Sequence, residues 1–376
     1  TEAFLLASSL ARNDALPMML LAGAIVALLR AADRETNSRA LAMAGLLLGL
    51  AVSAKINAAV PAAGAGLFVL LRARRLGIKS VIAFALGALA GLLPIAIFAL
   101  AAPENFRFGV FTYSLQAPQQ WWKAVGHASD LNPLNRIINL AELAFEGPIP
   151  FALAAAALDR RRTDGRLLLD LMIVGGLIGA YMPEPPFTQY LVPLLPPLYA
   201  RFALAIDGPR QRWYPVLLLL VVLGSIGGLV YTAVHTVRTI KRGGSDLVFA
   251  VEQGREVARL AAGRPIATLS PEAFAGSDTN IGKGFVTGPF LYRTYGGLSA
   301  LSLRLGFSPN WQRIDGAFRA QPPAVIVTGR EAKPWPPLFP NGMDAPLATW
   351  AWSHGYAPVP LPGGSTAFVR PTMGQL

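Results

Sequence analysis

Eight apolar segments fill the first two-thirds of this chain, and most are close to the roughly 20 residues that a membrane-crossing helix requires. Because backbone N–H and C=O groups in lipid must be hydrogen-bonded within the chain, apolar runs of this length predict helices. We expect spans at residues 14–30, 40–54, 58–71, 80–101, 140–158, 167–181, 190–206 and 214–237. The sequence therefore predicts an α-helical polytopic membrane protein with about eight full transmembrane helices.

Lysine and arginine residues gather in alternate gaps between these segments. Cytoplasmic loops carry an excess of Lys and Arg, so the basic gaps are predicted to be cytoplasmic and the others external. The basic gaps hold Arg30, Arg34 and Arg39, then Arg72, Arg74, Arg75 and Lys79, then Arg160, Arg161, Arg162 and Arg166, then Arg201, Arg210 and Arg212. Eight spans from an external start also place the C-terminus outside the cytoplasm. Candidate chemistry is therefore sought on the external face.

The composition agrees with a membrane protein and argues against other classes. Hydrophobic residues make up 53% and charged residues 14% of the chain, and the mean hydropathy of +0.45 lies outside the range of soluble proteins. The net charge of +12 resides in short loops without a basic stripe, so no nucleic-acid partner is expected. The absence of cysteine excludes disulfides and thiolate metal sites and fits an exported protein of the bacterial inner membrane.

Two domains are predicted. Residues 1–241 form the transmembrane domain, with a long external loop at about 103–135, and residues 242–376 form a soluble external domain of mixed α/β type. In the second domain the residue pattern predicts a helix over 246–262, strands over 265–269 and 324–328, and a hairpin over 356–369. Within the second span, Gly45 and Gly49 form a small-xxx-small pair that predicts close approach of a neighbouring helix.

Ionisable residues at the external ends of spans are the first candidate site residues, since charges that stay near a membrane are usually functional. Asp14 follows Arg12 at the mouth of the first span and is suited to binding a hard cation or orienting an acceptor. A helix N-cap is the structural alternative for Asp14. Lys55 lies beside Asn57 at a tight external corner, where a phosphate would be a natural ligand. Snorkelling to lipid headgroups is the alternative for Lys55.

Two later external segments add further candidates. The proline-rich turn at 183–189 presents Glu184, Gln189 and Tyr190 at the membrane surface in a stiff geometry. An ordinary loop with an interfacial tyrosine has the same pattern. Arg136 follows the long external loop, whose cationic and aromatic residues suit either interfacial anchoring or a lipid-phosphate substrate.

Four tryptophans are concentrated in the predicted external domain: Trp311, Trp335, Trp350 and Trp352. Core or interface packing is their common role, and stacking on carbohydrate is the alternative. The three histidines lie far apart in the sequence, so a histidine-rich metal site is not expected. The chain also has no phosphate-binding Walker loop and no Rossmann glycine pattern, which argues against soluble nucleotide-dependent enzymes.

Three motifs occur in a recognisable order: Ala-Arg-Asn-Asp-Ala-Leu-Pro opening the first span, Gly-x-x-x-Gly-Leu-Ala-x-x-x-Lys closing the second, and Gln-Tyr-Leu-Val-Pro-Leu-Leu-Pro on a late span. Together with the external α/β domain, this order resembles the bacterial GT-C glycosyltransferases, which include aminoarabinose and protein O-mannosyl transferases. The resemblance implies transfer of a sugar from a polyprenyl-phosphate carrier to a glycolipid, polysaccharide or protein of the cell envelope. It further implies inversion at the anomeric carbon.

The resemblance also implies roles for individual residues. Lys55 matches the lysine associated with the carrier phosphate, and Arg136 is a second candidate cation. Asp14 matches an acidic site close to the reaction centre, where it would help to hold a divalent cation such as Mg²⁺ or Mn²⁺. Gln189 and Tyr190 stand where many relatives have a basic-aromatic pair, and the glutamine departs from that pattern.

The start of the chain bears on the catalytic base. The apolar run at residues 3–10 is too short to cross a membrane, so we expect it to be the tail of a truncated helix preceded by further spans. In the GT-C enzymes the leading base lies in the first external loop, and no such acidic pair precedes Arg12. The catalytic aspartate is therefore expected upstream of Thr1.

Two other classes fit parts of the pattern. A transporter would place polar groups at mid-membrane on broken helices, whereas these spans hold few ionisable residues. A non-catalytic assembly or sensor protein with an external domain would need none of the charges at the span ends. Under the transferase interpretation, the partners are a polyprenyl-phosphate-linked sugar, membrane lipids and an acceptor.

Overall fold

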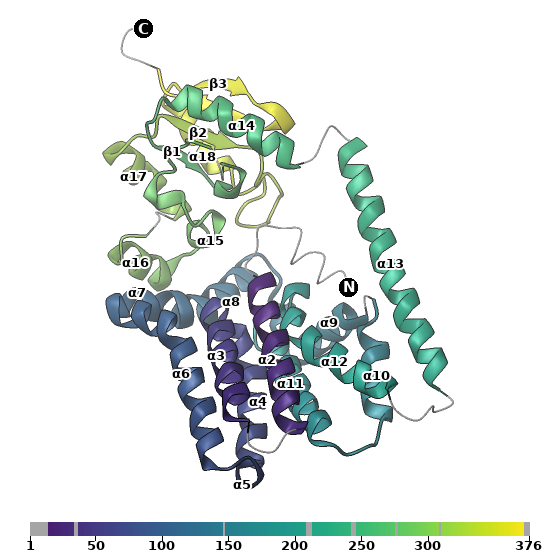
Figure 1. Ribbon diagram of the computed structural model, residues 1–376. Helices are drawn as coiled ribbons and strands as arrows, with labels where there is room; N and C mark the ends of the chain where they lie inside the picture. Colours follow the sequence, from purple (N-terminus) through teal and green to yellow (C-terminus); the bar gives the residue numbers. More distant parts are fainter. Residues whose placement is uncertain are drawn as a thin grey trace. The chain divides into compact units, whose positions relative to one another are not determined.

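The computed structural model describes residues 14–33, 37–145, 147–207, 213–241, 246–274, 277–307 and 310–371. It is mostly helical, with a small four-stranded sheet near the C-terminus (Figure 1). Contacts within the chain separate two compact units. The first unit comprises Thr1–Val110 and Asp130–Val234, and the second comprises Phe111–Ser129 and His235–Leu376.

The first unit is built from helices. They are α2 (Ala15–Asp33), α3 (Ser38–Ala54), the 3-10 helix η1 (Ile56–Ala58), α4 (Ala59–Leu71), α5 (Ala73–Leu76), α6 (Ile78–Ala101), α7 (Pro103–Arg107), α9 (Pro133–Phe145), α10 (Ile149–Leu158), α11 (Asp164–Tyr181), the 3-10 helix η4 (Thr188–Leu194), α12 (Leu195–Ile206) and α13 (Tyr214–Lys241), which continues into the second unit. Buried apolar side chains such as Leu21, Leu48, Phe68 and Leu168 join α2, α3, α4 and α11 into one core. A second core gathers residues of α10, α11 and α12.

The number of full spans differs from the expectation of about eight. Among the described residues, Ala15–Ala32 and Ile78–Ala101 are long and apolar enough to cross a membrane, with a third span if α9 and α10 together count as one. The predicted count is therefore not confirmed. Most of the other apolar helices are shorter. At 1.5 Å per residue the 13 residues of α4 rise about 20 Å, against a hydrocarbon core of about 30 Å.

Two predicted spans are also irregular. The segment 140–158 is broken, because α9 ends at Phe145 and α10 begins at Ile149 with a bend of 97° between them. Gly147, with φ of 110°, and Pro148 lie at this break, where a left-handed glycine followed by a proline cannot continue a helix. The segment 190–206 begins as the 3-10 helix η4, which contains Pro193, and becomes an α-helix from Leu195.

Glycines set the contact between α3 and α6. Gly45 and Gly49 on α3 face Gly87 and Gly91 on α6, and a Cβ on any of them would collide with the backbone of the other helix. A Cβ on Gly49, for example, would lie 2.9 Å from the Cα of Gly91. The predicted role of the Gly45 and Gly49 pair is confirmed, since glycines on both helices let the two backbones touch.

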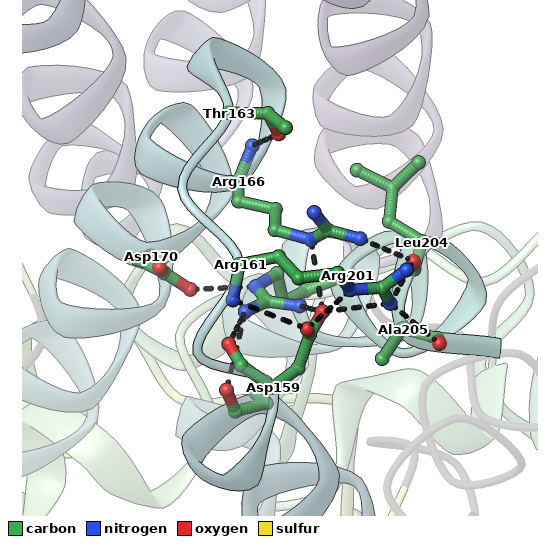
Figure 2. A network of polar contacts seen from close by, with 9 residues as sticks. Asp159, Arg161, Thr163, Arg166, Asp170, Arg201, Leu204 and Ala205 are labelled. Carbon is green, nitrogen blue, oxygen red and sulfur yellow. Dashed lines mark hydrogen bonds and ion pairs between the residues drawn. The ribbon is translucent and has the colours of Figure 1, made fainter. Parts of the chain in front are cut away.

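A charged cluster joins the ends of α10, α11 and α12 (Figure 2). Asp159, which follows α10, accepts from Arg161 Nε at 2.6 Å and from Arg201 Nη1 at 2.8 Å, and its Oδ2 also lies 2.8 Å from Arg166 Nε. The Arg201 side chain is 1% exposed and also donates to Asp170 Oδ1 at 2.9 Å. Arginines that the sequence identified as topology signals therefore also hold three helix ends together.

The electrostatics of Asp159 show which effect dominates in this cluster. Burial by itself would raise the pKa of the Asp159 carboxyl. The hydrogen bonds from Arg161 and Arg201 and the charge of Arg166 outweigh that effect and lower the pKa to about 2. The carboxylate thus stays charged at any physiological pH, and the cluster does not act as a pH switch.

The second unit contains the sheet. Its elements are α8 (Ser114–Ala124), the first half of η3 (Ala128–Leu131), α14 (Asp246–Ala261), β1 (Ile266–Thr268), η5 (Pro271–Phe274), η6 (Lys283–Phe285), α15 (Pro289–Tyr292), α16 (Gly296–Arg304), η7 (Trp311–Arg313), α17 (Ile314–Ala320), β2 (Val325–Thr328), α18 (Ala345–Ser353), β3 (Ala357–Pro360), η8 (Pro362–Gly364) and β4 (Thr366–Val369). The strand order is β1-β2-β4-β3; β1 is parallel to β2, and β4 is antiparallel to both its neighbours. The helix, strands and hairpin predicted for this region are all present.

The segment Phe111–Ser129 belongs to the second unit, although the sequence placed it in a loop of the transmembrane domain. It is largely helical, and its Trp121 is 2% exposed. The Trp121 ring packs 5.6 Å from Trp335 and 6.0 Å from Phe339, measured between ring centroids. Burial of a large aromatic side chain explains why this segment packs with residues far along the chain.

Candidate functional site

Two predicted site residues from different helices form an ion pair. Asp14 immediately precedes α2, and Lys55 follows the end of α3. Because α2 and α3 pack against each other, these ends meet, and Lys55 Nζ contacts Asp14 Oδ1. Asp14 is 1% exposed and the Lys55 side chain is 19% exposed. The pair is thus mostly buried, with the ammonium closer to solvent.

This geometry weighs against the structural alternatives for each residue. Asp14 makes no capping bond: Oδ1 is taken by Lys55, and Oδ2 has no hydrogen-bond partner within the described residues. The third helical position is Pro17, which has no N–H to donate to a cap. Lys55 in turn has a protein partner, so lipid headgroups are not required to neutralise it. Among the described residues, one buried carboxylate oxygen of Asp14 therefore has no partner.

Asn57, close to Lys55 in the sequence, has a side-chain amide without a partner among the described residues. It lies in η1, two residues after Lys55, and neither its Nδ2 nor its Oδ1 has a hydrogen-bond partner in the part of the chain that the structure describes. A buried polar group left without a partner costs about 1 to 3 kcal/mol, and a ligand could relieve that cost. Asp14 Oδ2 and the Asn57 amide thus both have hydrogen-bonding capacity that no described residue uses.

Arg136 and Glu184, predicted as separate substrate-binding residues, bind each other. Arg136 lies on α9 and is 8% exposed, and its Nη1 donates to Glu184 Oε1 at 2.8 Å. Its Nη2 donates to the carbonyls of Tyr181 and Met182 at the end of α11, and the guanidinium lies 4.3 Å from the centroid of the Tyr181 ring. These contacts make Arg136 a link between α9 and α11, and its Nε has no hydrogen-bond partner among the described residues.

The remaining predicted residues lie nearby or outside the described chain. Gln189 and Tyr190 are half-buried in η4, which contacts η1, α2, α9 and α11. The Tyr190 ring lies 6.0 Å from that of Phe187. Arg12 lies outside the described residues. The fold therefore brings the described candidates to one end of the first unit, and it joins four of them into two ion pairs.

Sequence reasoning did not anticipate either pairing. The sequence did hold an indication of pairing, because isolated acidic and basic residues are few in the predicted external segments. Charges that are mostly buried are usually paired, so the scarcity itself pointed to mutual partners. The choice of partner, however, depends on which helix ends meet.

A divalent cation at Asp14 stays a prediction. Among the described residues no group of three or more His, Cys, Asp or Glu is placed to hold a metal ion. Asp14 also faces an ammonium, whose positive charge opposes a second cation at the same carboxylate. The described residues thus fit a metal site poorly, and we derive no step through one.

Residues 1–100 match the family of dolichyl-phosphate-mannose-protein mannosyltransferases. The match covers just over a quarter of the chain and includes Asp14, Lys55 and Asn57. No curated protein and no solved structure matches the chain. The match supports the resemblance to the GT-C superfamily of membrane glycosyltransferases without selecting a specific member.

Proposed function

We propose that this protein transfers a sugar from a polyprenyl-phosphate carrier to a cell-envelope acceptor on the external face of the bacterial inner membrane. The observation that carries the proposal is the Asp14–Lys55 pair, which lies inside the matched segment and leaves Asp14 Oδ2 and the Asn57 amide without partners among the described residues. Buried polar atoms in folded proteins usually have partners, so a bound substrate would explain atoms that have none among the described residues.

The residue types suit an inverting displacement. The acceptor oxygen attacks the anomeric carbon, the bond to the carrier phosphate breaks, and the phosphate leaves with the electron pair. A lysine ammonium has three N–H donors, so Lys55 can keep one on Asp14 and direct the others to the leaving phosphate. In this proposal Asp14 Oδ2, which has no hydrogen-bond partner among the described residues, accepts a hydrogen bond from the acceptor hydroxyl and orients it. The acceptor hydroxyl also gives up its proton to a base, and we assign no described residue as that base.

An apolar cavity near Asp14 is suited to bind the hydrocarbon chain of the carrier. A cavity of about 480 Å³ begins one helical turn after Asp14, lined by Met18, Met19 and Ala22 of α2 together with residues of α12 and α13. An isoprenoid chain is a branched hydrocarbon that such a surface would remove from water. In the proposed complex the phosphate lies at Lys55 and the first isoprene units lie in this cavity.

The experiment compares turnover in the full-length protein with a polyprenyl-phosphate sugar as donor. Asp14→Asn should lower turnover tenfold or more, which corresponds to at least about 1.4 kcal/mol in the barrier. Ala22→Trp, which fills the apolar cavity, should raise KM for the donor more than it lowers kcat. Glu104→Gln, an exposed carboxylate on α7, is the matched control and should leave transfer unchanged. Near-normal transfer by a folded Asp14→Asn protein would remove this site from the reaction.

A further inference from the structure

The second unit holds an open cavity of about 670 Å³, within the size range of small-molecule sites. It is lined on one side by η7 and α17 and on the other by α18 and the segment 338–342. Of the four tryptophans in residues 242–376, Trp311 and Trp350 line the cavity. Trp335 packs on Trp121, and Trp352 lies against Phe368, so neither contributes to it.

Aromatic surfaces form part of the wall. Trp311 is half-buried and packs edge-on against Phe339, with ring centroids 5.4 Å apart. The Trp350 ring is covered by His354, which stacks on it at 3.9 Å with an angle of 14° between the rings, and the His354 side chain is exposed. The cavity thus offers the Trp311 indole and the outer face of His354, flat surfaces on which the C–H face of a sugar ring can pack.

Hydrogen-bonding groups surround these surfaces. Asp315 is held in place by Trp350 Nε1 at 3.1 Å and Arg319 Nε at 3.0 Å, both to Oδ1. Its side chain remains 55% exposed, so the carboxylate can accept further hydrogen bonds from the cavity. Gln312 and Asn341 are exposed on the lining and present amides that both donate and accept. Adjacent hydroxyls of a sugar need this mixture of planar donors and acceptors.

The charge balance selects a neutral ligand. Arg319 is paired with Asp315, so the charges of these two lining residues cancel. A phosphate or nucleotide would require cations that are not already neutralised. We propose that this cavity binds a neutral saccharide, with Trp311 as the stacking surface and Asp315, Gln312 and Asn341 as the polar contacts. The proposal is independent of the transfer reaction.

The test measures binding of methyl glycosides of glucose, galactose, mannose and N-acetylglucosamine to the full-length protein by saturation-transfer NMR. At least one should bind, and Trp311→Ala should weaken that binding tenfold or more. Asn341→Ala, at an exposed position where misfolding is not expected, should weaken it at least threefold. Trp352→Ala, an exposed tryptophan away from the cavity, and Asp14→Asn are the controls and should bind as the unchanged protein does.

Several results would overturn the proposal. The first is that none of the four glycosides binds. The second is that Trp311→Ala and Asn341→Ala bind the glycoside as tightly as the unchanged protein does. The third is that Trp352→Ala loses binding. Tighter binding of glucose 6-phosphate than of methyl glucoside would contradict the neutral character of the site. Because Asp14→Asn is included, loss of saccharide binding and loss of sugar transfer can be told apart.

Discussion

Replacing Lys55 by methionine removes the ammonium that pairs with Asp14 and leaves a carboxylate that is 1% exposed without its cation. Breaking a buried ion pair by removing one partner costs about 3 to 5 kcal/mol, because the remaining charge stays desolvated. The Lys55 side chain is 19% exposed, so water can partly replace it, and we expect the lower end, about 3 kcal/mol. Asp14→Asn should cost less, since the lysine left behind can reach solvent.

The double variant Asp14→Asn/Lys55→Met separates the pair from its surroundings. Removing both charges leaves no buried ion, so it should be more stable than Lys55→Met alone by about 1.5 kcal/mol or more. Equilibrium unfolding of the full-length protein, followed by circular dichroism, measures these differences. Lys79→Met is the matched control, because Lys79 is exposed and should change stability by less than about 0.5 kcal/mol.

Equal stability of Lys55→Met and Lys79→Met would refute the buried ion pair, and so would a double variant no more stable than Lys55→Met. The comparison also sharpens the functional assay. Weak donor binding in Lys55→Met alone could reflect the uncompensated Asp14 charge. Binding that stays lost in the more stable double variant would instead point to a direct contact between Lys55 and the carrier phosphate.

The remaining predictions concern packing, pH and topology. Gly49→Ala should destabilise the protein by about 1 to 3 kcal/mol, because the new Cβ would lie 2.9 Å from Gly91 Cα. Gly66→Ala is the control and should not destabilise the protein, since no described atom lies within 4 Å of its new Cβ. Thermal unfolding measures both variants. Burial, followed by the charges of Asp344 and Glu272, raises the pKa of the Glu331 carboxyl to about 7. The folded state therefore binds this proton more tightly than the unfolded state does, and the stability of the protein falls as the pH rises from about 4.5 to 7. Glu331→Gln should remove this loss of stability, which is worth about 1 to 2 kcal/mol after solvent screening. The same pH dependence of unfolding in Glu331→Gln and in the unchanged protein would contradict the prediction. If the second unit is external, an impermeant thiol reagent should label Lys283→Cys in intact cells and leave Arg160→Cys unlabelled, and the reverse pattern would refute the orientation.

The sequence by itself determined where most elements lie. The helices α2, α3, α4 and α6 begin and end within about three residues of the predicted spans, and the predicted strands appear as β1, β2 and the β3–β4 hairpin. Apolar run length, side-chain periodicity and glycine or proline at the ends are local properties, so they can be identified without knowledge of the fold. The approach of α3 to another helix was likewise visible in Gly45 and Gly49.

Only the tertiary structure decided which of these elements meet. Asp14 and Lys55 are 41 residues apart, and Arg136 and Glu184 are 48 apart, so their pairing depends on the packing of α2 on α3 and of α9 on α11. The same holds for Trp121, which lies in a segment assigned to the membrane domain but packs in the core of the second unit. A residue's type and neighbours in sequence determine which partners it can accept. Which partner it finds depends on burial and shape complementarity between segments far apart in the chain, and these properties arise only when the chain folds.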